Sequence, residues 1–209
     1  SLVANLDENK KYNKLTISNT LRSYKRFFTK SNFQKVKTKL QYHDDKNLVF
    51  LIGFPRSGTT LLDTILRSHS RIKVLEEQPY LLELRHKFFK NKNNDLTSLL
   101  DITQNEKDEI RSNYFDKIIT NKNDKDKIII DKLPLSIIEL GFIKFIFPKS
   151  KIIFSMRHPA DVAISCYFSS FKINDAMINF LQWKDTLKFY DQVLDLFEFY
   201  DKELELNYF

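Results

Sequence analysis

Short apolar runs and amphipathic stretches alternate along the chain after residue 46. Runs rich in Ile, Leu, Val and Phe predict buried strands at 48–52, 71–75, 128–130 and 151–156. Between these runs the apolar residues recur three or four positions apart. This spacing predicts helices after residue 58 and at 79–90, 106–120, 135–147, 160–171 and 174–201, the last as one helix or a pair. On the first of these helices we expect Leu61, Leu62, Ile65 and Leu66 to face inward.

A glycine turn joins the first predicted strand to the first predicted helix. Gly53 and Gly58 have the spacing of a Walker A loop, but Thr59 occupies the position of its lysine. The cation of this loop is Arg56 instead. A strand that passes through such a turn into a helix start directs free backbone N–H groups, and the positive end of the helix dipole, at one point. The loop therefore predicts a phosphate site without the lysine that ATP and GTP sites use.

The order of strands and helices predicts an α/β protein with a three-layer, P-loop-type fold, in which helices flank a central parallel sheet. Residues 1–46 are polar and lysine-rich, with a loose helical pattern. We expect them to be a helical lead-in that packs against the domain or ends an upstream helical region. Residues 47–209 form the main domain. Residues 203–209 resemble the beginning of a strand, so we expect the domain to be truncated there.

Polar residues follow each of the four predicted strands. Arg56 comes after the first, the pair Glu76 and Glu77 after the second, Lys132 after the third and Arg157 after the fourth. The carboxyl ends of parallel strands meet at one edge of a sheet, where ligands bind in such folds. We therefore predict an active site at this edge.

Three segments, in order, resemble sulfotransferases that use 3′-phosphoadenosine 5′-phosphosulfate (PAPS). They are PRSGTTLL (55–62), IIIDKLPLS (128–136) and KIIFSMRHPADVAISCY (151–167). The nearest branch is the tyrosylprotein and repeat-linked bacterial-type enzymes. The resemblance implies PAPS as donor, with no metal, and implies two sets of phosphate ligands. Arg56, Ser57, Gly58, Thr59 and Thr60 would hold the 5′-phosphate, and Arg157 and Ser165 the 3′-phosphate.

Two of these ligand assignments have plainer alternatives. Thr59 and Thr60 have the residue type that caps the first turn of a helix. Ser165 has the residue type that, within a helix, bonds back to its own backbone.

The same resemblance assigns the catalytic groups. Sulfuryl transfer follows the logic of phosphoryl transfer, so position and charge do most of the work, and Arg56 would stabilise the transferred group. Many cytosolic members carry His before Leu-Pro, but this chain has Lys132, which is charged at pH 7 and suits charge stabilisation. The base is then Glu77, since the tyrosylprotein branch has a Glu-Glu pair here. The alternative is that Glu76 and Glu77 only favour the start of the following helix.

Composition narrows the partners further. The net charge is +7 and the isoelectric point about 9.3, but the lysines are dispersed and no basic-aromatic motif for nucleic acid appears. Cys166 is the only cysteine, so neither a disulfide scaffold nor a cysteine metal cluster can form. No apolar run approaches the ~18–20 residues of a membrane span. We expect a cytoplasmic protein.

Two alternative functions remain open at this stage. One is a kinase or NTPase with a degenerate Walker A loop, for which 128–131 would serve as the Walker B strand. The other is a truncated, non-catalytic nucleotide-binding domain. The acceptor hydroxyl belongs to a glycan, a peptide tyrosine or a small molecule, and neither its identity nor the oligomeric state follows from the sequence. We expect the polar insert 91–126 and the long C-terminal helix to shape its pocket.

Overall fold

The computed structural model describes residues 11–41, 45 and 47–209. Its centre is a four-stranded sheet in the order β2-β3-β1-β4, in which every pairing of neighbouring strands is parallel. The strands are β1 (Leu48–Gly53), β2 (Ile72–Glu76), β3 (Ile128–Lys132) and β4 (Lys151–Ser155). The predicted parallel α/β fold, with helices flanking the sheet, is confirmed.

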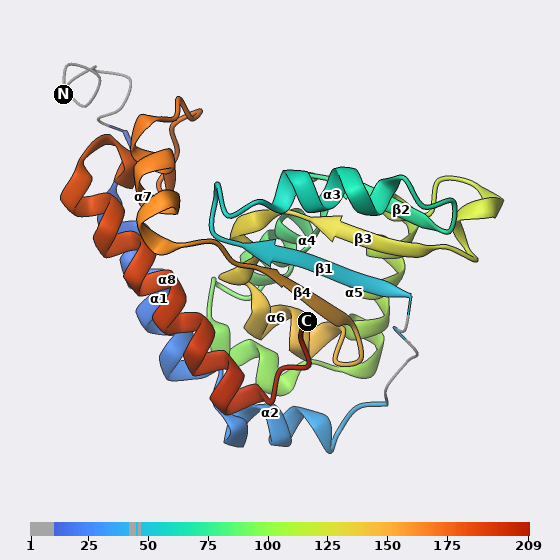
Figure 1. The fold of residues 1–209 in the computed structure, drawn as a ribbon. Coiled ribbons are helices and arrows are strands. Elements are labelled where there is room, and N and C mark those ends of the chain that lie inside the picture. The colour runs from blue at the N-terminus through green and yellow to red at the C-terminus, as the bar shows by residue number, and fades with distance from the viewer. Residues whose placement is uncertain (1–10, 42–44, 46) are drawn as a thin grey trace.

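The central strand β1 is buried along its whole length because helices cover both faces of the sheet. Val49 and Leu51 face helix α3 (Thr59–Arg67), where they form a small apolar cluster with Ile130. Leu48, Phe50 and Ile52 face the larger core on the other side, beneath which lie α5 (Gln104–Ile118) and α6 (Leu140–Ile146). Figure 1 shows α3 above the sheet and these helices below it.

Helices α1 (Lys14–Phe27) and α2 (Lys30–Lys37) share that larger core. Phe28, which follows α1, is fully buried against Phe145 and Tyr200. A Cβ at Gly141 of α6 would lie 2.4 Å from the Phe28 ring, so this packing requires glycine. Helix α1 also lies along α8 (Trp183–Leu204), as Figure 1 shows.

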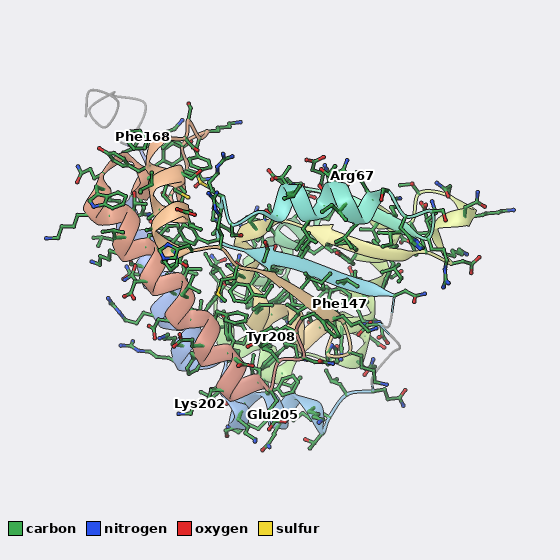
Figure 2. All side chains as sticks on the ribbon, in the orientation of Figure 1. Arg67, Phe147, Phe168, Lys202, Glu205 and Tyr208 are labelled. Carbon is green, nitrogen blue, oxygen red and sulfur yellow. The ribbon has the colours of Figure 1, made fainter. Side chains whose placement is uncertain are left out.

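The remaining elements complete the flanking layers. They are α4 (Tyr80–Lys90), α7 (Pro159–Phe168) and the 3-10 turns η3 (Leu96–Asp101), η4 (Lys122–Asp124), η5 (Pro134–Ile137) and η6 (Met177–Leu181). Near the C-terminus Tyr208 forms a parallel bridge to Ile152 at the free edge of β4, in agreement with the strand-like pattern there (Figure 2). Within residues 11–41, 45 and 47–209, none of the helices has the length and apolar character needed to cross a bilayer.

Two predictions about helices are wrong, one about which face of a helix is buried and one about the extent of a helix. Leu61 and Ile65 of α3 are 69% and 59% exposed, because the buried face of this helix is formed by Thr59, Leu62, Asp63 and Leu66 at spacings of three and four. The stretch expected as one amphipathic helix at 135–147 divides into η5 and α6. Every residue of α6 is buried, because the sheet covers one side of it and α2 and α8 lie on others.

Candidate functional site

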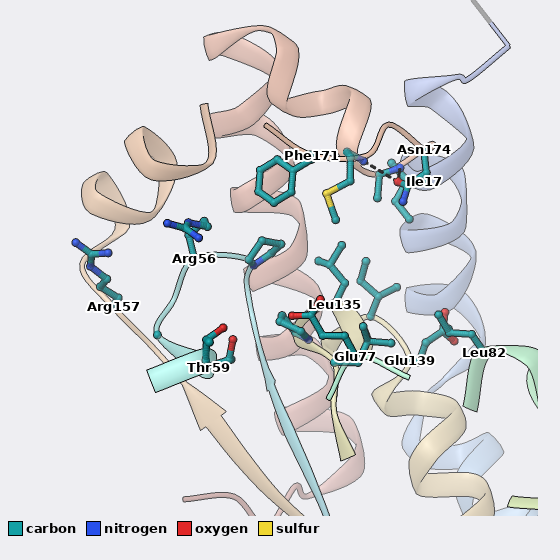
Figure 3. A pocket seen from close by; sticks show the side chains of 18 residues that line it. Ile17, Arg56, Thr59, Glu77, Leu82, Leu135, Glu139, Arg157, Phe171 and Asn174 are labelled. Atoms are coloured by element: carbon teal, nitrogen blue, oxygen red, sulfur yellow. Dashed lines mark hydrogen bonds between the residues drawn. The ribbon is translucent and has the colours of Figure 1, made fainter. Parts of the chain in front are cut away.

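A cavity of about 680 Å³ opens where the carboxyl ends of the strands meet. The predicted site residues in its wall are Arg56, Gly58, Thr59, Thr60, Glu77 and Arg157. Segments far away in the sequence complete it: Ile17 of α1, Leu82 of α4, residues 133–135, 138 and 139, and part of 171–177. Figure 3 shows the two arginines on one side of the cavity, Glu77 near its middle and Glu139 beyond it.

The loop after β1 has a backbone that few residues tolerate. Arg56 and Gly58 have φ of 68° and 100°, in the left-handed region. A Cβ at Gly53 would lie 2.6 Å from the Ser155 carbonyl oxygen and 2.6 Å from Ser57 Oγ. Such close packing fixes the loop and directs its backbone toward the start of α3. Strained backbone of this kind is concentrated at functional sites.

The start of α3 carries no side-chain cap. Gly58 is its N-cap residue, and the helix begins at Thr59, so the alternative that Thr59 and Thr60 serve as ordinary caps is wrong. The first-turn N–H groups of a helix without such a cap are available to an anion, which the helix dipole also favours.

Ser57, in the same loop, does not line the cavity but has a buried hydroxyl. Its side chain is 5% exposed, and its Oγ has no hydrogen-bond partner among the residues that the structure describes. A buried hydroxyl without a partner is costly, and a phosphate oxygen would satisfy it. The loop residues therefore fit a phosphate-bearing group.

The two predicted phosphate sites lie next to each other. Arg56 Nε donates a hydrogen bond of 2.9 Å to Ser165 Oγ on α7, so the Ser165 hydroxyl is bound by the loop rather than by its own backbone. The Arg157 side chain is half exposed, and its guanidinium lies 3.4 Å from Asp161. Ser165 itself does not line the cavity. The structure thus brings the loop and α7 together through Arg56.

Glu77 and Lys132 form an ion pair at the ends of β2 and β3. Lys132 Nζ lies 3.0 Å from Glu77 Oε1, and the Glu77 N–H donates to the Lys132 carbonyl oxygen at 2.8 Å. Glu77 has φ of 49°, a second strained residue at the site. Lys132 is fully buried and does not line the cavity, and it contacts the cavity wall through Glu77.

Asp63, a residue that the sequence analysis did not select, supports this ion pair from α3. Its fully buried carboxylate accepts two hydrogen bonds from Arg67 and lies 3.7 Å from Lys132 Nζ. Arg67 also reaches Glu76, and this hydrogen bond is the main reason why the pKa of Glu76 is lowered, with Lys132 second. The four-residue spacing of Asp63 and Arg67 is a sequence signal for a helical ion pair, but it does not show which face of the helix is buried. Glu76 is thus paired with Arg67 and Lys132. The N-cap residue of the following helix, α4, is Pro79, so neither Glu76 nor Glu77 caps that helix.

A second network of polar residues stands at the other end of the cavity. Glu139, at the N-cap of α6, accepts one hydrogen bond of 3.0 Å from the Tyr24 hydroxyl and forms an ion pair with Arg85 at 2.9 Å. Arg85 Nε also donates a hydrogen bond of 2.8 Å to the Tyr24 hydroxyl. Burial raises the pKa of Glu139. The only sequence signal for this site is a single acid in an otherwise apolar stretch.

The expected contribution of the insert 91–126 to the pocket is wrong, because none of its residues lines the cavity. It packs instead through α5 against α4 and α6. The segment before α8 does contribute, through Asn174, Ala176 and Met177.

Comparison with known proteins gives the family to which most of the chain belongs. A profile of the sulfotransferase family matches residues 48–206. An uncharacterised protein of Aquifex aeolicus is 30% identical over 151 residues, which is 68% of this chain and 20% of that protein. Protein-tyrosine sulfotransferase 1 of Homo sapiens is 27% identical over 129 residues, 59% of this chain and 34% of that protein. Protein-tyrosine sulfotransferase of Drosophila melanogaster is 27% identical over 120 residues, 56% of this chain and 24% of that protein.

The chain therefore spans 20% to 34% of the length of these relatives. The profile match, however, extends from the first residue of β1 to beyond the end of α8. It includes every residue that we placed in the candidate site except Ile17 and Tyr24 of α1. From β1 to the end of α8, this chain belongs to the sulfotransferase family.

Proposed function

We propose that this protein transfers a sulfuryl group from PAPS to an acceptor hydroxyl. The observation that carries the proposal is the cavity itself: the phosphate-type loop, two arginines and a single strained carboxylate, Glu77, all line one space. The names of the relatives point to a peptide tyrosine among the possible hydroxyl acceptors, beside glycans and small molecules.

The nucleotide would lie at the cationic end of the cavity. The N–H groups at the start of α3 and the hydroxyls of Thr59 and Thr60 would hold the 5′-phosphate, with Arg56 as its counter-charge. Ser57 does not line the cavity, so its hydroxyl would reach the phosphate only after a rotation of its side chain. Arg157 and Ser165 would hold the 3′-phosphate after small rotations of side chains that now pair with Asp161 and Arg56. When bound, PAPS would supply the sulfuryl group that the acceptor oxygen receives.

Glu77 would take the proton from the acceptor hydroxyl. It is the carboxylate nearest to the middle of the cavity, and Lys132 and the backbone bond to β3 hold it in place (Figure 3). The buried ammonium of Lys132 and the guanidinium of Arg56 would together stabilise the negative charge that develops during transfer. Asp63 would keep Lys132 in position.

Isothermal calorimetry with nucleotides tests the donor assignment. We expect adenosine 3′,5′-bisphosphate to bind at least about 10-fold more tightly than 5′-AMP, because Arg157 would contribute a charge-assisted bond to the additional phosphate. A preference for ATP over the bisphosphate would overturn the proposal in favour of phosphoryl transfer.

Transfer of labelled sulfonate from PAPS to a panel of hydroxyl compounds tests the activity. We expect labelled product that depends on Glu77. Tight binding of the bisphosphate without transfer to any member of the panel would instead support a nucleotide-binding domain without catalysis.

A further inference from the structure

Charged residues of opposite sign line the two ends of the cavity, although Glu139 at one end is paired with Arg85 behind the wall. Arg56 and Arg157 line the end at the phosphate loop. Beyond Glu77, the only charged residue in the described part of the wall is Glu139, and no lysine or arginine lines that end. Figure 3 shows the arginines and Glu139 on opposite sides of Glu77. An acceptor that reacts at Glu77 would therefore extend toward a second carboxylate.

Glu139 is built into this wall rather than lying on a free surface. It is 6% exposed, and it is held by residues from two other helices, Tyr24 of α1 and Arg85 of α4. Both of these partners bind Oε2. Within the described chain no hydrogen bond is donated to Oε1. A nearly buried carboxylate oxygen with unused acceptor capacity, at the wall of a cavity, can accept a hydrogen bond from a ligand.

The surroundings of Glu139 are apolar. Ile17, Leu82, Leu135, Ile138 and Met177 line the same cavity, and Figure 3 shows Ile17 and Leu82 on the side away from the two arginines. Side chains of this kind favour a ligand with an apolar body. The few polar groups of the cavity wall then determine how that ligand is oriented. They also exclude water, which strengthens any charged contact made there.

We infer that Glu139 is a specificity-determining residue, which selects hydroxyl acceptors that combine an apolar body with a hydrogen-bond donor, preferably an amine, remote from the reacting hydroxyl. An acceptor with a carboxylate in that place would face Glu139 at short range and would be excluded. The inference rests on the proposed function, because it assumes that the acceptor hydroxyl lies at Glu77.

Three phenols of similar size, which differ only at the end away from the hydroxyl, test this inference. They are tyramine with an amine, para-ethylphenol with no charge and para-hydroxyphenylpropionate with a carboxylate. Their affinities would be measured by calorimetry on the full chain saturated with adenosine 3′,5′-bisphosphate. We expect tyramine to bind about 10- to 100-fold more tightly than the carboxylate, with ethylphenol between them, as for a hydrogen bond between charged groups.

The variant Glu139→Gln keeps the shape of the side chain and removes its charge. We expect it to reduce the preference for tyramine over ethylphenol by about 10-fold. Because this variant leaves Arg85 without its counter-charge, the double variant Arg85→Gln, Glu139→Gln is a second test, with the same expected loss of preference. The control is Glu83→Gln, which removes an exposed acid that pairs with Lys117 outside the cavity and should preserve the preference.

Equal binding of the three phenols, tighter binding of the carboxylate, or binding of none at millimolar concentration would overturn the inference. So would an unchanged preference in both Glu139 variants. Saturation with the bisphosphate is measured first, so a failure of the nucleotide site is seen separately from a failure of the acceptor site.

Discussion

The cationic end of the cavity is assembled from segments that directly follow β1 and β4, whereas the opposite end is assembled from α1, α4, α6 and the segment before α8. The loop of the first end depends on local chain geometry, with left-handed residues at Arg56 and Gly58 and a helix start without a cap, although Arg56 also bonds to Ser165, 109 positions away. The second depends on long-range packing, with Tyr24 and Glu139 separated by 115 positions in the sequence.

This difference explains what each end can contribute. A local loop presents the same N–H groups whatever surrounds it. Under the proposed function, it therefore suits the nucleotide that donates the sulfuryl group, which is the same for every acceptor. A wall made from several helices varies with each side chain that reaches it, so it suits acceptor choice. Glu77 lies between the two ends, and changes there should affect turnover while leaving nucleotide binding intact.

The largest expected effect therefore concerns Glu77. Glu77→Gln should lower kcat by about 100- to 10,000-fold, because the acceptor proton loses its base. Affinity for adenosine 3′,5′-bisphosphate should stay within about twofold, since an amide near Lys132 preserves the local shape. Steady-state kinetics and calorimetry measure the two quantities, with Glu83→Gln as control. A variant with full activity would remove the base assignment.

Arg157→Ala tests the cationic end alone. We expect a loss of about 10- to 100-fold in affinity for the bisphosphate, because a charged contact to the 3′-phosphate is removed, and almost no change in affinity for 5′-AMP. Unfolding should not change, since the Arg157 side chain is half exposed and pairs only with Asp161 among the described residues. Arg71→Ala, an exposed arginine away from the cavity, is the matched control. Equal losses for both nucleotides would argue against a separate 3′-phosphate site.

Asp131 leads to a prediction about how the free energy of unfolding depends on pH. It does not involve either end of the cavity. Burial raises the pKa of this carboxyl to about 6, although Tyr114 donates a hydrogen bond to it. Since the folded state then holds the proton more tightly than the unfolded state, Asp131 favours folding most below about pH 4. That contribution is lost as the pH rises to about 6.

The free energy of unfolding of the wild type should therefore fall by about 2 kcal/mol between pH 4 and 7, relative to Asp131→Asn, which does not titrate there. Urea unfolding at several pH values measures this difference, with Asp126→Asn, a change at an exposed position, as control. Parallel pH profiles for wild type and Asp131→Asn would contradict the prediction.

Tyr24→Phe tests the helix-built wall and has the smallest expected effect. It removes the hydroxyl that bonds to Glu139 and Arg85, so the free energy of unfolding should fall by about 1 kcal/mol. Affinity for the bisphosphate should be unchanged, because Tyr24 does not line the cavity. Tyr167→Phe, at a surface tyrosine, should leave stability unchanged. A loss of nucleotide affinity in Tyr24→Phe would show that the two ends are not independent.

The same division marks how far the sequence could predict the structure. The strands, the loop and the positions of Arg56, Glu77, Lys132 and Arg157 at strand ends follow from periodicity and from parallel topology. The exposure of Leu61 and Ile65 did not follow, because spacing along a helix does not show which side the sheet covers. The network of Asp63 depends on the contact of α3 with the ends of β2 and β3, and that of Glu139 on contacts between helices distant in sequence, so no local pattern encodes either one.

A crystal structure of the protein with adenosine 3′,5′-bisphosphate would test the central claim most directly. We expect the 5′-phosphate against the loop from Gly53 to Thr60, the 3′-phosphate within hydrogen-bond distance of Arg157 and Ser165, and open space between the nucleotide and Glu77. A nucleotide bound elsewhere, or one whose phosphates lie away from Arg56 and Arg157, would contradict it.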